Sequence, residues 1–148
     1  GPDLREDMFI SATYMVLDPR LTSITCARAG HEPALVYRAS ENRVSMLQGG
    51  GMAVGIDRGE LFDTVLEDSI LALNPGDFIV FYTDGVTEAQ DPQGREFGKD
   101  NLMETITASA NEPAARIVDR ITERVRRFAG DRAPYDDVTV IVLKRKNY

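Results

Sequence analysis

The sequence predicts a single α+β domain built on antiparallel sheet. Short apolar segments separated by turn residues fill the first half of the chain. Helical apolar spacing follows after residue 98, and a last strand-like segment lies near the C-terminus. Strands followed by helices are typical of α+β folds. A length of 148 residues with 43% hydrophobic content suits one domain with a real core.

The first two strands are predicted at Phe9–Leu17 and Leu21–Ala29. The first segment is rich in β-branched and aromatic residues, which favour strands. It stops at the turn signal Asp18-Pro19, and the second segment begins soon afterwards. We therefore expect a hairpin, followed by another turn over residues 29–33.

The next two strands are predicted at Ala34–Arg38 and Val44–Leu47, as a pair across a polar turn. Gly49–Gly51 is interpreted as a flexible connection. Phe62–Leu73 is long and mixed in character, and we expect one or two strands there. Asn74–Asp77 is a strong turn signal, and a nearly continuous apolar strand follows it.

A first helix is predicted from Gly98 to Ala110, with apolar residues at helical spacing. A second helix is expected to use Asn111 as its N-cap, to carry Pro113 in its first turn and to stop at Gly130. One face of this helix is apolar, and it consists of Ile117, Val118, Ile121, Val125 and Phe128.

The opposite side of the second helix carries acid–arginine pairs at i,i+4 spacing, Glu112 with Arg116 and Glu123 with Arg127. A final strand is predicted at Val138–Leu143.

Composition excludes several classes of function. The net charge of −7 argues against a nucleic-acid or anionic-membrane binder. Cys26 is the only cysteine, so no disulfide framework exists and we expect a small buried side chain. No apolar run approaches the roughly 20 residues that span a bilayer, and no signal peptide is visible, so we expect a cytoplasmic protein. Gly1-Pro2 is typical of a remnant left by tag cleavage.

Two carboxylates stand at the ends of predicted core strands. Asp84 follows the apolar run after residue 77, and Asp136 precedes the last strand. If the two strands are antiparallel neighbours, both acids lie at one edge of the core. Carboxylates suit Mg²⁺ or Mn²⁺, which prefer oxygen ligands. Thr83 and Thr139 are expected to add hydrogen bonds around them.

From these residues alone, solvated turn acids remain the alternative. Asp-Gly is a common hairpin turn, and paired aspartates before a strand often lie in loops. However, Val86–Ala89 does not begin an alternating strand after the Asp-Gly pair, which argues against a hairpin. His31, the only histidine, is interpreted as a structural residue in a turn, because no serine or cysteine is placed to pair with it. Gly49–Gly51 lacks the Gly-Lys-Ser/Thr ending of a phosphate loop.

The chain resembles the PPM-type protein serine/threonine phosphatases, in their bacterial SpoIIE-like branch. The order and spacing of five segments match along nearly the whole chain. The runs Thr83–Glu88 and Asp136–Thr139 are the most specific. The five segments are residues 9–14, 29–33, 51–55, 75–89 and 136–139.

The resemblance implies an antiparallel β-sandwich flanked by helices, with a two-metal Mn²⁺ or Mg²⁺ site at one edge. Asp84 and Asp136 match the family's metal ligands, and Asp137 is interpreted only as a neighbour. The implied reaction is hydrolysis of phosphoserine or phosphothreonine by a metal-activated water, without a covalent enzyme intermediate. The implied substrate is a phosphorylated signalling protein, an anti-sigma-factor antagonist of a bacterial stress-response pathway.

The chain also departs from the family pattern. Glu32 and Ala53 replace common prolines, which we expect to affect loop stiffness more than chemistry. The upstream aspartate that bridges the two metals in the family is not found among these residues. We therefore interpret residues 3–148 as the C-terminal majority of the domain, without its N-terminal strands and helices. We expect the chain alone to be weakly active or inactive, and to self-associate through exposed sheet.

Two other interpretations stay open. One is a catalytically inactive, phosphatase-like module that binds a partner without chemistry. The other is an unrelated α+β domain whose turn acids match by chance. The presence of both acids favours the enzyme, because an inactive module need not keep them.

Overall fold

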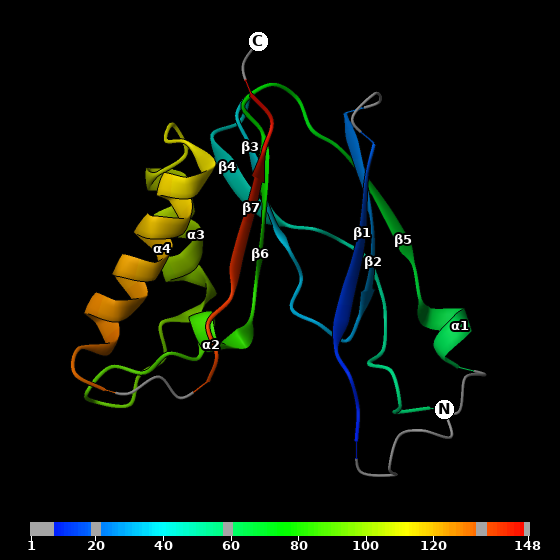
Figure 1. Cartoon of the computed structure of the whole chain (residues 1–148), viewed down its shortest axis with the longest axis horizontal. Helices are drawn as coiled ribbons and strands as arrows, with labels where there is room; N and C mark the ends of the chain where they lie inside the picture. Colours follow the sequence, from blue (N-terminus) through cyan, green and yellow to red (C-terminus); the bar gives the residue numbers. More distant parts are fainter. Residues whose placement is uncertain (1–7, 19–21, 58–60, 133–135, 147–148) are drawn as a thin grey trace. The chain divides into compact units, whose positions relative to one another are not determined.

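The computed structural model describes residues 8–18, 22–57, 61–132 and 136–146. They form two compact units, one of residues 1–33 and 47–73 and the other of residues 34–46 and 74–148 (Figure 1). Each unit has its own antiparallel sheet, so the predicted α+β class is confirmed. The Gly1-Pro2 pair lies outside the described residues. No helix in the described part of the chain is long and apolar enough to cross a membrane.

The first unit is built on a three-stranded sheet in the order β1-β2-β5. Its strands are β1 (Ala12–Asp18), β2 (Ser23–Ala29) and β5 (Asp68–Ala72). Strands β1 and β2 pair antiparallel from Ala12 with Ala29 to Asp18 with Ser23, which confirms the predicted hairpin.

The two faces of this sheet differ in exposure. Ile24, Cys26 and Leu71 are buried on one face, and Cys26 therefore has the role expected for it. Burial raises the pKa of the Cys26 thiol, because the apolar surroundings disfavour the thiolate. Tyr14 and Ile70 lie on the other face and are largely exposed.

The prediction of strand throughout Phe62–Leu73 is wrong in its first part. Residues Phe62–Val65 form a single helical turn, α1, and only the second part is strand. Local hydrogen bonds favour this turn, because a carboxylate oxygen of Asp57 accepts from Leu61 N at 2.8 Å. The carbonyl of Leu61 accepts in turn from the hydroxyl of Thr64 at 2.7 Å.

The glycine run 49–51 is packed closely against neighbouring backbone. Arg28 donates to the carbonyl of Gly49 at 2.7 Å, and Gly50 N donates to Glu67 Oε2 at 3.0 Å. A Cβ on Gly51 would lie 1.5 Å from the carbonyl oxygen of Arg28. Glycine is therefore required for close approach, and the interpretation as a simple flexible connection was incomplete.

The second unit combines a four-stranded sheet with three helices. The sheet order is β4-β3-β6-β7, and every pairing is antiparallel. The strands are β3 (Leu35–Arg38), β4 (Arg43–Met46), β6 (Phe78–Tyr82) and β7 (Val140–Lys144). The helices are α2 (Asp84–Thr87), α3 (Gly98–Ala108) and α4 (Ala114–Ala129).

The core of the second unit lies between its sheet and the helices α3 and α4 (Figure 1). Alternate residues of β6 face this core, because side chains alternate across a strand. Phe97 meets Phe128 edge to face, with ring centroids 5.4 Å apart. The fully or nearly fully buried members include Leu35, Phe78, Val80, Tyr82, Leu102, Ile106, Ile117 and Ile121.

The ends of α4 show one confirmed prediction and one error. Gly130 follows the helix with φ of 62°, as expected of a stop. The N-cap is Pro113 rather than Asn111, and no side chain caps the helix. The carbonyl of Pro113 accepts from the N–H groups of Arg116 and Ile117. An extended ψ of 154° at Pro113 moves the helix start two residues beyond the predicted cap.

Both predicted i,i+4 ion pairs of α4 are present on its surface. Arg116 lies 3.8 Å from Glu112, and Arg127 lies 3.9 Å from Glu123. Exposed pairs of this kind contribute little stability, so packing of the apolar face dominates.

Candidate functional site

The two candidate acids lie on segments that the sheet brings together. Strands β6 and β7 are antiparallel neighbours, and their last pair joins Tyr82 with Val140. The contact continues beyond the sheet, because Thr83 N donates to the carbonyl of Thr139 at 3.1 Å. The two strands are therefore neighbours, as expected. Asp84 and Asp136 lie just beyond the sheet at the same end.

Asp84 is the first residue of α2 rather than the last residue of a strand. Thr83 before it is still extended, and the chain turns immediately into the helix. The segment is thus not a hairpin, as the residues after the Asp-Gly pair indicated. The carboxylate of Asp84 is exposed, and its Oδ1 accepts from Gly85 N at 3.0 Å.

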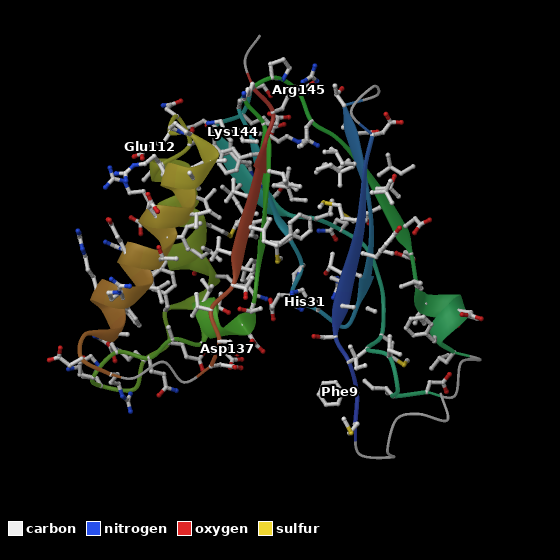
Figure 2. All side chains as sticks on the ribbon, in the orientation of Figure 1. Phe9, His31, Glu112, Asp137, Lys144 and Arg145 are labelled. Carbon is white, nitrogen blue, oxygen red and sulfur yellow. The ribbon has the colours of Figure 1, made fainter. Side chains whose placement is uncertain are left out.

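Gly85 allows the segment around Asp136 to approach α2. A Cβ at position 85 would lie 2.5 Å from the carbonyl oxygen of Asp137 and 3.2 Å from that of Asp136. Because real side chains do not tolerate the first distance, a glycine is needed here. Figure 2 shows Asp137 beside α2, at this end of the sheet.

The hydroxyl of Thr83 fastens the two segments to each other. It donates to the carbonyl of Asp137 at 2.8 Å and accepts from Thr139 N at 2.9 Å. Thr83 was expected to hydrogen bond around the acids, and the structure shows it bonding to backbone instead. Its effect is to fix the chain that carries Asp136.

The carboxylates offer donors that suit a hard cation. Asp136 Oδ1 accepts from Asp137 N at 2.7 Å, just as Asp84 Oδ1 accepts from Gly85 N. The second oxygen of each carboxylate has no hydrogen-bond donor among the described residues. Exposed carboxylate oxygens fit part of a Mg²⁺ or Mn²⁺ shell, in which waters usually complete the octahedron. The described residues contain no group of three acids, histidines or cysteines that could hold a metal ion.

His31 lies in a bend of the first unit, as predicted. The structure nevertheless places a serine near it, since Ser11 Oγ is 3.4 Å from His31 Nδ1. This corrects the expectation that no serine is placed to pair with the histidine. The two residues are 20 positions apart, on β-bridged segments whose proximity the local pattern does not reveal.

Sequence reasoning missed two arginines that line a cleft next to Gly85. Arg126 and Arg132 were not singled out, because the basic residues of α4 indicated only a solvated face. One signal was available for the first of them. Arg126 has Thr122 and Gly130 at i−4 and i+4, so it lacks the acid at i,i+4 spacing that Arg116 and Arg127 have.

Comparison with known families identifies the chain. Residues 2–146 match the family model described as Stage II sporulation protein E, SpoIIE. The chain belongs to the SpoIIE family. This family is one of PP2C-type serine/threonine phosphatases, so the resemblance seen in the sequence motifs is confirmed.

Two curated relatives support the assignment to the SpoIIE family. Protein IcfG of Synechocystis sp. is 33% identical over 138 residues, which cover 93% of this chain and 21% of the relative. The phosphoserine phosphatase RsbU of Bacillus subtilis is 32% identical over 145 residues, which cover 94% of this chain and 40% of the relative. The chain thus spans less than half the length of either relative.

Solved structures support the fold of this SpoIIE-family chain. The phosphatase domain of the cell fate determinant SpoIIE from Bacillus subtilis, presoaked with Mn, matches with a TM-score of 0.70 at 22% identity. The match covers 93% of this chain and 57% of that domain. At this identity the likeness shows the shared fold alone.

Proposed function

We propose that the protein containing this chain is a Mn²⁺- or Mg²⁺-dependent phosphatase that hydrolyses phosphoserine or phosphothreonine on a signalling protein. One observation carries the proposal. Asp84 and Asp136, on segments joined through Thr83, each keep a carboxylate oxygen without a described donor. Membership of the SpoIIE family supports the same reaction class.

The residues of this chain have distinct roles in the proposal. Asp84 and Asp136 would hold the metal, and a bound Mn²⁺ or Mg²⁺ supplies water activation and neutralises phosphoryl oxygens. Thr83 fixes the backbone of residues 137–139 against the start of α2. Gly85 leaves room for that approach. Position and charge would thus come from two short segments, each anchored to a strand of the four-stranded sheet.

The substrate class is proposed from the family resemblance. A phosphorylated anti-sigma-factor antagonist is the expected partner, and the similarity to the phosphoserine phosphatase RsbU of Bacillus subtilis supports a phosphoserine substrate. The charge of −7 disfavours nucleic acid as an alternative phosphate-bearing substrate. We also propose a cytoplasmic location.

A partner-binding module without chemistry is the second candidate. The observation that favours it is the lack of a third metal-binding side chain among the described residues. Two carboxylates hold divalent ions weakly, so we propose that the 148-residue chain alone is weakly active or inactive. Binding of a phosphorylated protein by the whole protein, without phosphate release, would support this candidate.

Metal binding tests the proposed ligands directly. We expect Asp84→Asn and Asp136→Asn each to weaken Mn²⁺ binding by about tenfold or more, because each removes a charged oxygen ligand. Isothermal titration calorimetry on the chain measures the affinity, and Mn²⁺-dependent phosphate release from a phosphoserine protein measures activity in the whole protein.

Asp137→Asn is the matched control, because it removes the same charge from the adjacent residue. It is expected to bind Mn²⁺ as the parent chain does. Equal Mn²⁺ affinity in all four proteins would contradict the assignment of Asp84 and Asp136. Phosphate release that persists in a chelator would contradict the metal-dependent reaction.

A further inference from the structure

A cleft of about 670 Å³ lies beside the candidate acids, within the second unit. The last turns of α4 form one wall, and the segment from α2 to Gln90 forms the other. Figure 1 shows α2 and the C-terminal end of α4 at the same end of this unit. Gly85 lines the cleft, so the residue that follows Asp84 belongs both to the cleft and to the site of the candidate acids. The volume is that of a pocket for a small ligand or a few peptide residues.

The described lining of the cleft combines apolar and basic side chains with the neutral polar side chains of Gln90 and Thr122. Ala89, Val125, Ala129 and Val138 supply apolar surface. The charged groups described there are two guanidinium groups, those of Arg126 and Arg132, and no described carboxylate lines the cleft. This excess of positive charge stands out in a chain with 24 acidic and 17 basic residues.

Arg126 differs from the other arginines of α4. Arg116, Arg120, Arg124 and Arg127 each form ion pairs with acids of α3, α4 or the loop between them. Among the described residues, no acid forms an ion pair with Arg126. Its charge is therefore available to a carboxylate that comes from outside the chain.

Arg132 is held in position at the other side of the cleft. Its Nη1 donates to the carbonyl of Asp91 at 2.9 Å and to Gln90 Oε1 at 3.3 Å. A guanidinium group carries five N–H donors in a rigid plane, so these two bonds orient the group and leave further donors.

A second groove beside α4 also contains arginines, but acids of the chain neutralise their charge. It lies between α3 and α4 and is lined by Arg120, Arg124 and Arg127 together with Glu104, Glu112 and Glu123. Those arginines are already paired with those acids. Charge complementarity therefore favours an acidic ligand in the cleft beside Gly85 and not in this groove.

We propose that the cleft binds the substrate segment next to the phosphorylated residue, and that it selects an acidic side chain beside an apolar one. This inference rests on the proposed phosphatase function, because Gly85 links the cleft to the acids that would act on the phosphate. Arg126 and Arg132 contact the acidic side chain, and Val125 and Val138 contact the apolar one.

Peptide binding tests the cleft without relying on turnover. The probes are two fluorescein-labelled phosphoserine peptides, one with Glu and Leu beside the phosphoserine and one with Lys and Leu. Fluorescence anisotropy is expected to show tighter binding of the Glu peptide by the parent chain. Arg126→Glu should weaken binding of the Glu peptide by about tenfold and favour the Lys peptide, because the charge at position 126 of the cleft wall changes from positive to negative.

Arg127→Glu is the matched control, with the same charge change one residue away and outside the cleft. It is expected to keep the preference of the parent chain. The cleft assignment is overturned if the parent chain binds neither peptide or both equally, or if the two arginine variants behave alike. Phosphate release is measured separately in the whole protein, so its absence there counts against the proposed function while the binding result stands.

Discussion

At the scale of single residues, two aspartates of this chain have opposite roles. Asp77 is 1% exposed, and its carboxylate accepts from Ala39 N, Asn74 N and the guanidinium group of Arg38. Asp84 is exposed and accepts one backbone N–H. The first carboxylate is saturated and joins β3 to the start of β6, whereas the second remains able to take a ligand.

Asp77 gives a prediction on acid stability. Burial alone would raise its pKa, but hydrogen bonds from Ala39, Arg38 and Asn74 outweigh burial and hold the pKa below the ordinary value of 3.8. The stability from this group is therefore present above the ordinary pKa and is lost as pH falls through the lowered one. We expect Asp77→Asn to cost about 2 kcal/mol at neutral pH.

Urea unfolding at neutral pH and at a pH below the lowered pKa of Asp77 measures this effect. The difference between parent and variant should shrink in acid, since the parent carboxylate is then protonated. Asp119→Asn removes an exposed carboxylate of α4 and is the control, with little change expected. A loss of stability that is the same at both pH values would contradict the role of the charge.

At the scale of elements, a lysine from the last strand holds the connection between α3 and α4. Lys144 Nζ donates to the carbonyls of Ala110 at 2.5 Å and Glu112 at 2.9 Å. It also lies 5.4 Å from the ring centroid of Phe78. Burial lowers the pKa of Lys144, because the ammonium group loses water. One residue of β7 thus satisfies carbonyls in the helix–helix connection.

Lys144→Met tests this connection, because methionine keeps an apolar stem over Phe78 and removes the donor. We expect a loss of about 1–3 kcal/mol, the cost of leaving buried carbonyls without a donor. Compared with the parent chain, hydrogen exchange of the variant should show a larger loss of protection in the first turn of α4 than in β6. Unchanged stability and protection would show that water replaces the lysine.

Periodic elements were predictable from the sequence, and local exceptions were not. The apolar spacing of Ile117, Ile121 and Val125 gave α4 and its buried face correctly. Helix α1 was missed, because hydrogen bonds around Asp57 and Leu61 outweigh a strand-like composition. The N-cap was misplaced, because the ψ angle of Pro113 decides the helix start and no side chain marks it.

The candidate site was predictable as far as strand pairing could place it. Asp84 and Asp136 were expected to meet because β6 and β7 are neighbours, and the register confirms the pairing. The approach of Ser11 to His31 and the cleft arginine Arg126 depend on contacts between segments far apart in the chain. Spacing along one segment carries no information about such contacts.

At the scale of the whole molecule, the exposed face of the first sheet has a consequence for assembly. Tyr14 is 71% exposed and Ile70 is 76% exposed, and both lie on the face that also carries Val16. Large apolar side chains gathered on one face of a sheet favour association. We propose that a second copy of this chain covers this face in solution.

The double variant Tyr14→Ser and Ile70→Thr is expected to lower the average mass of the chain measured by light scattering. Ile56→Thr is the control, because Ile56 is 63% exposed but lies outside the sheet. A parent chain that stays monomeric over the accessible concentration range would contradict the proposal. So would an equal effect of the control.

The order of the strands along the chain limits how this protein can be divided. The backbone passes from one unit to the other three times, because β3 and β4 interrupt the first unit and residues 47–73 interrupt the second. No contiguous segment therefore contains one whole sheet without strands of the other. Recombination with a relative between β4 and β5 would join parts of both sheets from different parents, whereas a crossover at either of the other two passages would divide one sheet. For a crossover between β4 and β5, the strand contacts from β2 to β5 and from β3 to β6 would have to match at once.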